Sequence, residues 1–136
     1  MKKVKVLHIY KTSIEESFGG IETFIHNLCE EGEMYDIDNL VMTLSPIPKN
    51  QTINMGKYKL IKVKQSFHIF QTSFSFGAFF KFRQLIKNVD IVHYHFPYPF
   101  ADILHFICGV NKPSIITYHS DIIRQKRIFK FYKRSE

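Results

Sequence analysis

The sequence predicts an α/β fold, a doubly wound parallel sheet with helices on both faces, formed by one domain over residues 1–136. Two observations support this prediction. Short apolar runs typical of buried strands alternate with runs whose apolar residues recur every three or four positions, as on one face of a helix. A length of 136 residues and a hydrophobic content of 45% also suit a single domain with its own core.

The first strand is expected at Val4 to Tyr10, because apolar residues after Lys5 occupy both faces, as in a central strand covered from both sides. A helix is expected at Ile21 to Glu31, ending at Gly32. Apolar residues at helical spacing should form its buried face, namely Ile21, Phe24, Ile25, Leu28 and Cys29.

The middle of the chain is expected to supply an edge of the sheet. A strand at about Asn39 to Leu44 leads into a loop with proline and asparagine, Ser45 to Asn54. Tyr58 to Val63 is typical of a more exposed strand with spaced lysines. Ser66 to Ser75 is rich in aromatic residues and fits no single element, whereas Phe76 to Lys87 has the spacing of a helix.

The last third predicts two more strands and two more helices. A strand is expected at Asp90 to His95, and Pro99 suits the first turn of a helix that continues to Cys108. The remaining elements are a last buried strand at Ser114 to Tyr118 and a basic amphipathic helix at Ile122 to Tyr132.

A glycine pair, Gly19–Gly20, lies between the first strand and the first helix. Free N–H groups at a helix N-terminus bind anions, and glycine lets a ligand approach the backbone closely. The alternative is that the pair only shapes the connection. Eight residues separate Tyr10 from Gly19, so no dinucleotide fingerprint is present, and bound NAD or ATP is not expected.

Histidines stand at two predicted strand ends, His93 and His95 on one strand and His119 on the next. Three imidazoles could bind zinc, but no carboxylate is placed to orient them, and no bound metal is expected. His119 and Asp121 could instead recognise hydroxyl groups; a core histidine and a helix-capping aspartate are the alternatives. Because ligands bind beyond the carboxyl ends of parallel strands, residues 18–22, 93–97 and 118–121 should converge.

The net charge of +7 is concentrated near the end of the printed sequence, where six of the 19 lysines and arginines fall within Arg124 to Arg134. Four of them could lie on an anionic membrane surface between apolar residues: Arg124, Lys126, Arg127 and Lys130. A solvated helix face is the alternative. No nucleic-acid-binding motif accompanies the charge, so nucleic acid is not an expected partner.

Several observations favour a cytoplasmic protein, peripheral at the inner face of the plasma membrane. No apolar run reaches the roughly 20 residues that cross a bilayer. Cys29 and Cys108 have no metal-binding or redox spacing, and no leader precedes the first strand. Disulfides are therefore not expected.

Three segments in this order, Phe18–Glu22, Asp90–Pro99 and Thr117–Ile122, resemble the N-terminal domain of family 4 glycosyltransferases. The sequence is especially similar to bacterial polysaccharide and lipopolysaccharide members, many of which are mannosyltransferases. The resemblance implies half of a GT-B arrangement, in which two Rossmann-like domains face a cleft. It also implies metal-independent transfer with retention of configuration, from a nucleotide sugar such as GDP-mannose to a glycan or lipid-linked acceptor.

The resemblance also implies roles for individual residues. Gly19 and Gly20 match the glycine loop near the donor diphosphate and the acceptor. His119 matches the catalytic histidine that contacts the transferred sugar, and Asp121 the acidic position that often follows it. His93 and His95 match the strand end that faces the cleft and are expected to bind substrate.

The sequence departs from the family pattern in one important way. The basic residues and the E-x7-E glutamate pair of the donor domain are not present; Glu22 and Glu30 have that spacing but lie on the first helix. We therefore expect a C-terminally truncated acceptor-side domain that is inactive alone, its partner being the missing C-terminal domain or a separately encoded half. The alternatives are a basic membrane-surface or partner-binding module and an inactive remnant.

Overall fold

The computed structural model describes residues 3–69 and 72–119, so the predicted helix Ile122–Tyr132 lies outside the described residues. The main sheet has six strands in the order β3-β4-β2-β1-β7-β8. They are β1 (Val4–Ile9), β2 (Ile37–Ser45), β3 (Gln51–Asn54), β4 (Lys59–Lys64), β7 (Ile91–Phe96) and β8 (Ser114–Tyr118). The other elements are α1 (Gly20–Gly32), the 3₁₀ turn η1 (Glu33–Tyr35), the hairpin β5 (Phe67–Ile69) and β6 (Thr72–Phe74), α2 (Phe76–Ile86) and α3 (Pro99–Ile107).

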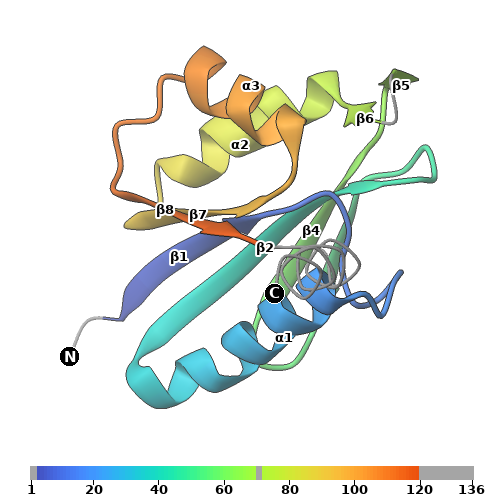
Figure 1. Cartoon of the computed structure of the whole chain (residues 1–136). Coiled ribbons are helices and arrows are strands. Elements are labelled where there is room, and N and C mark those ends of the chain that lie inside the picture. The colour runs from blue at the N-terminus through green and yellow to red at the C-terminus, as the bar shows by residue number, and fades with distance from the viewer. Residues whose placement is uncertain (1–2, 70–71, 120–136) are drawn as a thin grey trace, which may run out of the picture.

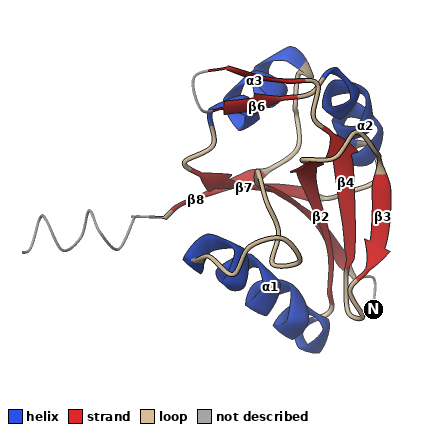
Figure 2. Cartoon of the chain, turned by 90° about the vertical axis from the view of Figure 1, so that its right-hand side faces the viewer, coloured by secondary structure: helices blue, strands red, loops and turns tan. Residues whose placement is uncertain are grey.

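Helices cover both faces of this sheet, α1 on one side and α2 and α3 on the other (Figures 1 and 2). All neighbouring strands pair in parallel except β3, which pairs antiparallel with β4. The chain runs outward from β1 through α1 to β2, and later crosses to the other side of β1 to form β7. The predicted doubly wound α/β fold is therefore confirmed, and the strand order reverses between β1 and β7.

The centre of the sheet is β1, as its sequence predicts. Leu7 and Ile9 are fully buried, and Val6 and Tyr10 are 7% and 3% exposed, so neighbouring positions that alternate between the two faces are covered. The same strand buries one polar side chain, His8, which is 2% exposed. A buried imidazole in a central strand needs hydrogen-bond partners, and these partners define the candidate site described below.

The middle of the chain supplies an edge of the sheet, as predicted, but the prediction that Tyr58–Val63 is a more exposed strand is wrong. The strand β4 lies inside the sheet, because β3 pairs along its outer side and forms the edge. β3 arises from the segment expected to be a loop, and a turn at Gly56 (φ 97°) joins the two strands. Lys62 of β4 is consequently buried rather than solvent-exposed.

The prediction that Ser114–Tyr118 is buried is also wrong. β8 is the outer strand of the sheet next to β7, so its apolar side chains are exposed on both faces. Ile115, Ile116 and Tyr118 are 45%, 65% and 61% exposed. The described elements therefore leave the apolar side chains of this strand largely exposed.

The helices match their predicted ranges closely, but the buried face of α1 differs from the expected one. Ile25 and Cys29 are buried as predicted, whereas Phe24 and Leu28 are 42% and 37% exposed. Both cysteines are free thiols. Among the described helices, none is long and apolar enough to cross a membrane.

Candidate active site at the carboxyl ends of three strands

The adjacent strands β1, β7 and β8 bring five polar side chains onto one face of the sheet. His8 pairs in register with His93, and His95 pairs with Thr117. His119 follows β8 directly, and its backbone N–H donates to the carbonyl of Phe96 at 2.9 Å. The strand ends that the sequence expected to converge are therefore neighbours.

A chain of hydrogen bonds links these histidines. His8 Nε2 lies 2.8 Å from Asn39 Oδ1 of β2, and His8 Nδ1 lies 3.0 Å from His95 Nε2. The chain continues from His95 Nδ1 to His119 Nε2, again 3.0 Å apart. Every ring nitrogen of His8 and His95 is therefore used, and His119 is the outermost member. We call Asn39, His8, His95 and His119 the histidine relay.

His93 lies beside the relay rather than in it. Its Nε2 is 2.6 Å from Thr117 Oγ1, and its ring stacks on that of His95 with centroids 4.1 Å apart. This stacking contact constrains the plane of the His95 ring. The hydrogen bond to Thr117 ties β7 to the outer strand β8.

Burial keeps the relay neutral at neutral pH. Burial, opposed by the hydrogen bond to Asn39, lowers the pKa of His8 to about 4. Burial and the neighbouring histidines lower the pKa of His93 to about 4 and that of His95 to about 2. Burial also lowers the pKa of His119. Each of these rings therefore has one N–H donor and one acceptor nitrogen at pH 7.

Phe24 of α1 covers the outer end of the relay. Its ring meets that of His119 edge-on at a centroid distance of 4.9 Å and that of His95 at 6.2 Å. Gly20 precedes Phe24 by four positions and so lies on the same face of the helix, one turn nearer its start. Gly20 therefore lies on the same face of α1 as Phe24, which is the face that contacts His119.

The glycine pair begins α1, with Gly19 as the N-cap (φ −65°) and Gly20 as the first helical residue. Neither glycine has a positive φ. A Cβ added at Gly19 would stand 2.7 Å from Glu22 Oε2, whereas one added at Gly20 would meet nothing within 4 Å. A Cβ at Gly19 would thus press only on the end of the Glu22 side chain, and neither backbone conformation nor crowding within the described residues explains glycine at position 20.

Ion pairs hold the loop that leads to the glycine pair. Lys62 Nζ of β4 lies 2.7 Å from Glu15 Oε2 and also pairs with Glu16. Burial, the largest influence, lowers the pKa of the Lys62 ammonium, but the two carboxylates outweigh it and the pKa is raised. The connection between β1 and α1 is thus anchored to the sheet by a buried cation.

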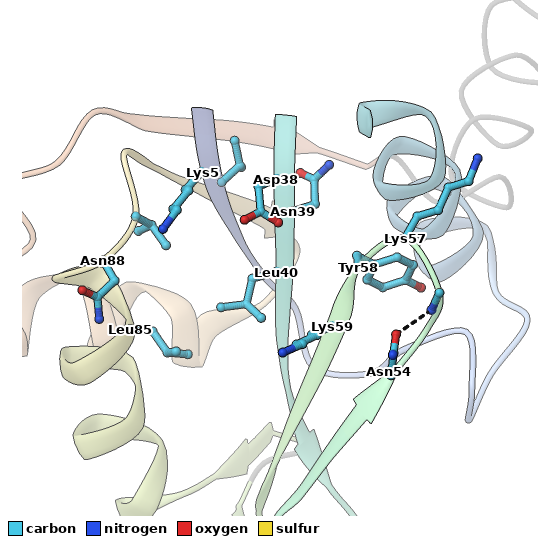
Figure 3. Close-up of a pocket in the computed structure, with 13 residues that line it drawn as sticks. Lys5, Asp38, Asn39, Leu40, Asn54, Lys57, Tyr58, Lys59, Leu85 and Asn88 are labelled. Carbon is cyan, nitrogen blue, oxygen red and sulfur yellow. Dashed lines mark hydrogen bonds between the residues drawn. The ribbon is translucent and has the colours of Figure 1, made fainter. Parts of the chain in front are cut away.

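Two cavities of about 410 Å³ each lie elsewhere, and no histidine lines either of them. One is at the amino ends of the strands, between Lys5, Asp38 and Lys59 (Figure 3). Asn39, the inner end of the relay, forms part of its wall. The relay therefore runs from this cavity to the opposite edge of the sheet.

Three histidine rings also lie close enough together to be considered as a possible metal-binding site. The ligand atoms of His8, His93 and His95 lie within 4.8 Å of one another. This group differs from the one considered from the sequence, which included His119 in place of His8. Both ring nitrogens of His8 and of His95 are hydrogen-bonded, so binding a metal there would break at least one bond of the relay.

Sequence reasoning missed four contributors to this site: His8, Phe24, Asn39 and Thr117. His8 gave the only direct signal, as a polar residue in an otherwise apolar central strand. Several predicted site residues lie outside the described residues, namely Asp121, Arg124, Lys126, Arg127 and Lys130.

Comparisons with known proteins agree on one family. Residues 18–136 match the family model described as Glycosyltransferase Family 4. The chain is 45% identical over 130 residues to D-rhamnosyltransferase WbpZ of Pseudomonas aeruginosa. The matched region makes up 96% of this chain and 34% of that relative. It is 38% identical over 130 residues to O-antigen chain mannosyltransferase C of Escherichia coli, with 96% and 35% covered. The chain thus spans about a third of the length of these relatives. No solved structure matches.

Proposed function

The chain belongs to glycosyltransferase family 4, and we propose that it forms the acceptor-side half of a sugar-transfer cleft in surface polysaccharide synthesis. Its two relatives are named for the transfer of D-rhamnose and mannose. D-Rhamnose is 6-deoxy-D-mannose, so the two sugars share their ring configuration. We therefore propose a donor with a manno-configured sugar, such as GDP-mannose, and a glycan or lipid-linked acceptor.

The observation that carries this proposal is the position of His119. It lies at the carboxyl end of β8, where it is hydrogen-bonded to His95 of β7 and covered by Phe24 of α1. A neutral imidazole there can form a hydrogen bond with a sugar hydroxyl, as donor or as acceptor. We assign His119 the catalytic position that contacts the transferred sugar. His95 is fully buried with both nitrogens bonded, so we assign it to holding His119.

The start of α1 is the proposed site for the donor diphosphate. The first N–H groups of a helix have no partner within the helix and attract anions. Because Gly20 has no Cβ, a phosphate can approach these N–H groups closely. The reaction would retain configuration and use no bound metal, with cationic groups of the donor-side domain stabilising the departing diphosphate.

We propose that these 136 residues alone, which span about a third of the length of these relatives, have no appreciable transferase activity. A chimera tests the function directly: this chain replaces the matching first third of the D-rhamnosyltransferase relative. The chimera should transfer sugar from a GDP-linked donor, whereas the isolated chain should not. Transfer by the isolated chain would overturn the claim of inactivity, and an inactive, folded chimera would count against the functional assignment.

A second proposal concerns Arg124, Lys126, Arg127 and Lys130, whose positive charge is interleaved with apolar residues. We propose that this segment contacts anionic lipid at the inner face of the plasma membrane, where a lipid-linked acceptor would be found. Sedimentation with vesicles containing anionic lipid should show binding that weakens at high salt. Absence of binding at low salt would remove this proposal.

A further inference from the structure

The hydrogen bonds of the histidine relay all donate in the same direction, and this direction is set by its innermost residue, Asn39. The Oδ1 atom of Asn39 can only accept a hydrogen bond, so the proton of the 2.8 Å contact belongs to His8 Nε2. A neutral imidazole has one N–H, so His8 Nδ1 must accept from His95 Nε2. His95 Nδ1 in turn must accept from His119 Nε2.

We propose that Asn39 and His8 are positioning residues that fix the tautomer of His119, so that His119 presents a bare Nδ1 acceptor to its ligand. In this arrangement all three histidines are Nε2–H tautomers. Because His119 Nε2 is used inward, Nδ1 is the nitrogen that remains for a ligand. The group it recognises must then be a donor, such as a sugar hydroxyl, and not an ether oxygen or a carboxylate.

The surroundings of Asn39 hold its amide in the required orientation. The amide nitrogen lies against Gly32, the last residue of α1, so closely that a Cβ at Gly32 would collide with it. The carboxyl end of a helix carries partial negative charge, which favours an NH₂ group over an oxygen at that position. The amide oxygen is thereby turned toward His8.

Burial makes this direction persist along the relay. Asn39, His8 and His95 are 5%, 2% and 0% exposed, so water cannot readily replace any link. Hydrogen bonds in series polarise one another in a low-dielectric interior, which strengthens the chain and makes its outer nitrogen a better acceptor. Reversing the Asn39 amide would reverse every link and turn His119 into a donor.

Nitrogen-15 NMR of the histidine rings tests the tautomers in the 136-residue chain without any substrate. At pH 7.5, His8, His95 and His119 should each show a protonated Nε2 and a bare Nδ1. An Nδ1–H tautomer at His119 in the unaltered chain would overturn the proposal. This measurement needs no variant, so the fate of a destabilised mutant cannot obscure it.

Variants of Asn39 test the origin of the direction. Asn39→Leu should give His119 a mixture of both tautomers, whereas Asn39→Asp keeps an acceptor and should keep the Nε2–H form. Asn88→Leu is the matched control, because Asn88 lines the same cavity and lies outside the relay. An unchanged His119 tautomer in folded Asn39→Leu would contradict the role of Asn39.

The consequence for transfer rests on the proposed function and is tested separately in the chimera. Asn39→Leu should lower kcat about tenfold, equivalent to about 1.4 kcal/mol in the barrier, with a smaller change in KM, and Asn39→Asp should restore it. If the tautomers are as predicted but Asn39→Leu leaves kcat unchanged, the role in catalysis is wrong. If the unaltered chimera is inactive, the proposed function fails while the tautomer result stands.

Discussion

The Nε2 atom of His119 lies 3.0 Å from Nδ1 of His95, so the residue at the edge of the sheet is held by one that is fully buried. His95 is in turn bonded to His8 of the central strand. The orientation of a group at the surface is thus set by the interior of the domain. Substitutions in the interior should therefore affect both stability and the site.

His95→Ala should destabilise the chain by about 2–4 kcal/mol, because it leaves a cavity and removes the partners of two other imidazoles. His119→Ala removes one partly exposed ring and should cost about 1 kcal/mol. Urea unfolding followed by circular dichroism measures both changes. Equal, small losses for the two variants would contradict the relay as described.

Gly20→Ala should leave stability unchanged or raise it by about 0.4–1 kcal/mol, because a Cβ there meets no atom of the protein and the unfolded chain loses freedom. In the chimera the same variant should weaken binding of GDP-mannose. Gly32→Ala is the control: its Cβ would collide with the Asn39 amide, and it should cost about 1–3 kcal/mol. Destabilisation by Gly20→Ala would favour the alternative of a purely structural glycine pair.

Lys62→Met should release the loop before the glycine pair, because Glu15 and Glu16 lose the cation that holds them. We expect a loss of about 1 kcal/mol and faster hydrogen exchange of the loop amides. Lys64→Met, at an exposed position of the same strand, should leave exchange unchanged. Equal exchange in the two variants would show that Lys62 does not anchor the loop.

Stability should fall as the pH decreases from about 6.5 toward 4. The unfolded chain takes up protons on its histidines near pH 6.5. In the folded chain burial lowers the pKa of His8 and His93 to about 4 and that of His95 to about 2, so these rings stay neutral. The unfolded state then binds more protons, and lower pH favours it.

The window above pH 5 isolates this effect, because ordinary carboxyl groups titrate at about pH 4. Each buried histidine should contribute a slope on the order of 1 kcal/mol per pH unit, and His8→Gln should reduce the total slope. Urea unfolding at pH 7.5, 6.0 and 5.0 measures it. The same free energy of unfolding at all three values would contradict the buried, neutral relay.

Local patterns predicted most of the fold, since the apolar strand at Val4–Ile9 and the helix at Gly20–Gly32 follow from short-range periodicity. β3 was missed because its four residues carry no pattern of their own and become a strand only by pairing with β4. The burial of β8 was overpredicted because its sequence does not reveal that it is the outermost strand among the described elements.

The site was only half predictable for the same reason. His93, His95 and His119 could be placed at strand ends, but the bond from His8 to His95 joins residues 87 positions apart and depends on β1 lying beside β7. Asn39 enters the site from the other side of β1, through the pairing of β1 with β2. These are consequences of the order of strands, which short-range periodicity does not contain.

The rate of sugar transfer by the chimera, compared with that of its His119→Ala variant, shows whether His119 takes part in the reaction. Loss of a positioned group at the reacting sugar should lower kcat about 100-fold or more. His105→Ala is the matched control, because this histidine is hydrogen-bonded to Tyr94 on the opposite face of the sheet. We expect a large loss for His119→Ala and near-normal transfer for His105→Ala; equal rates in a folded His119→Ala variant and the unaltered chimera would exclude a catalytic role for His119.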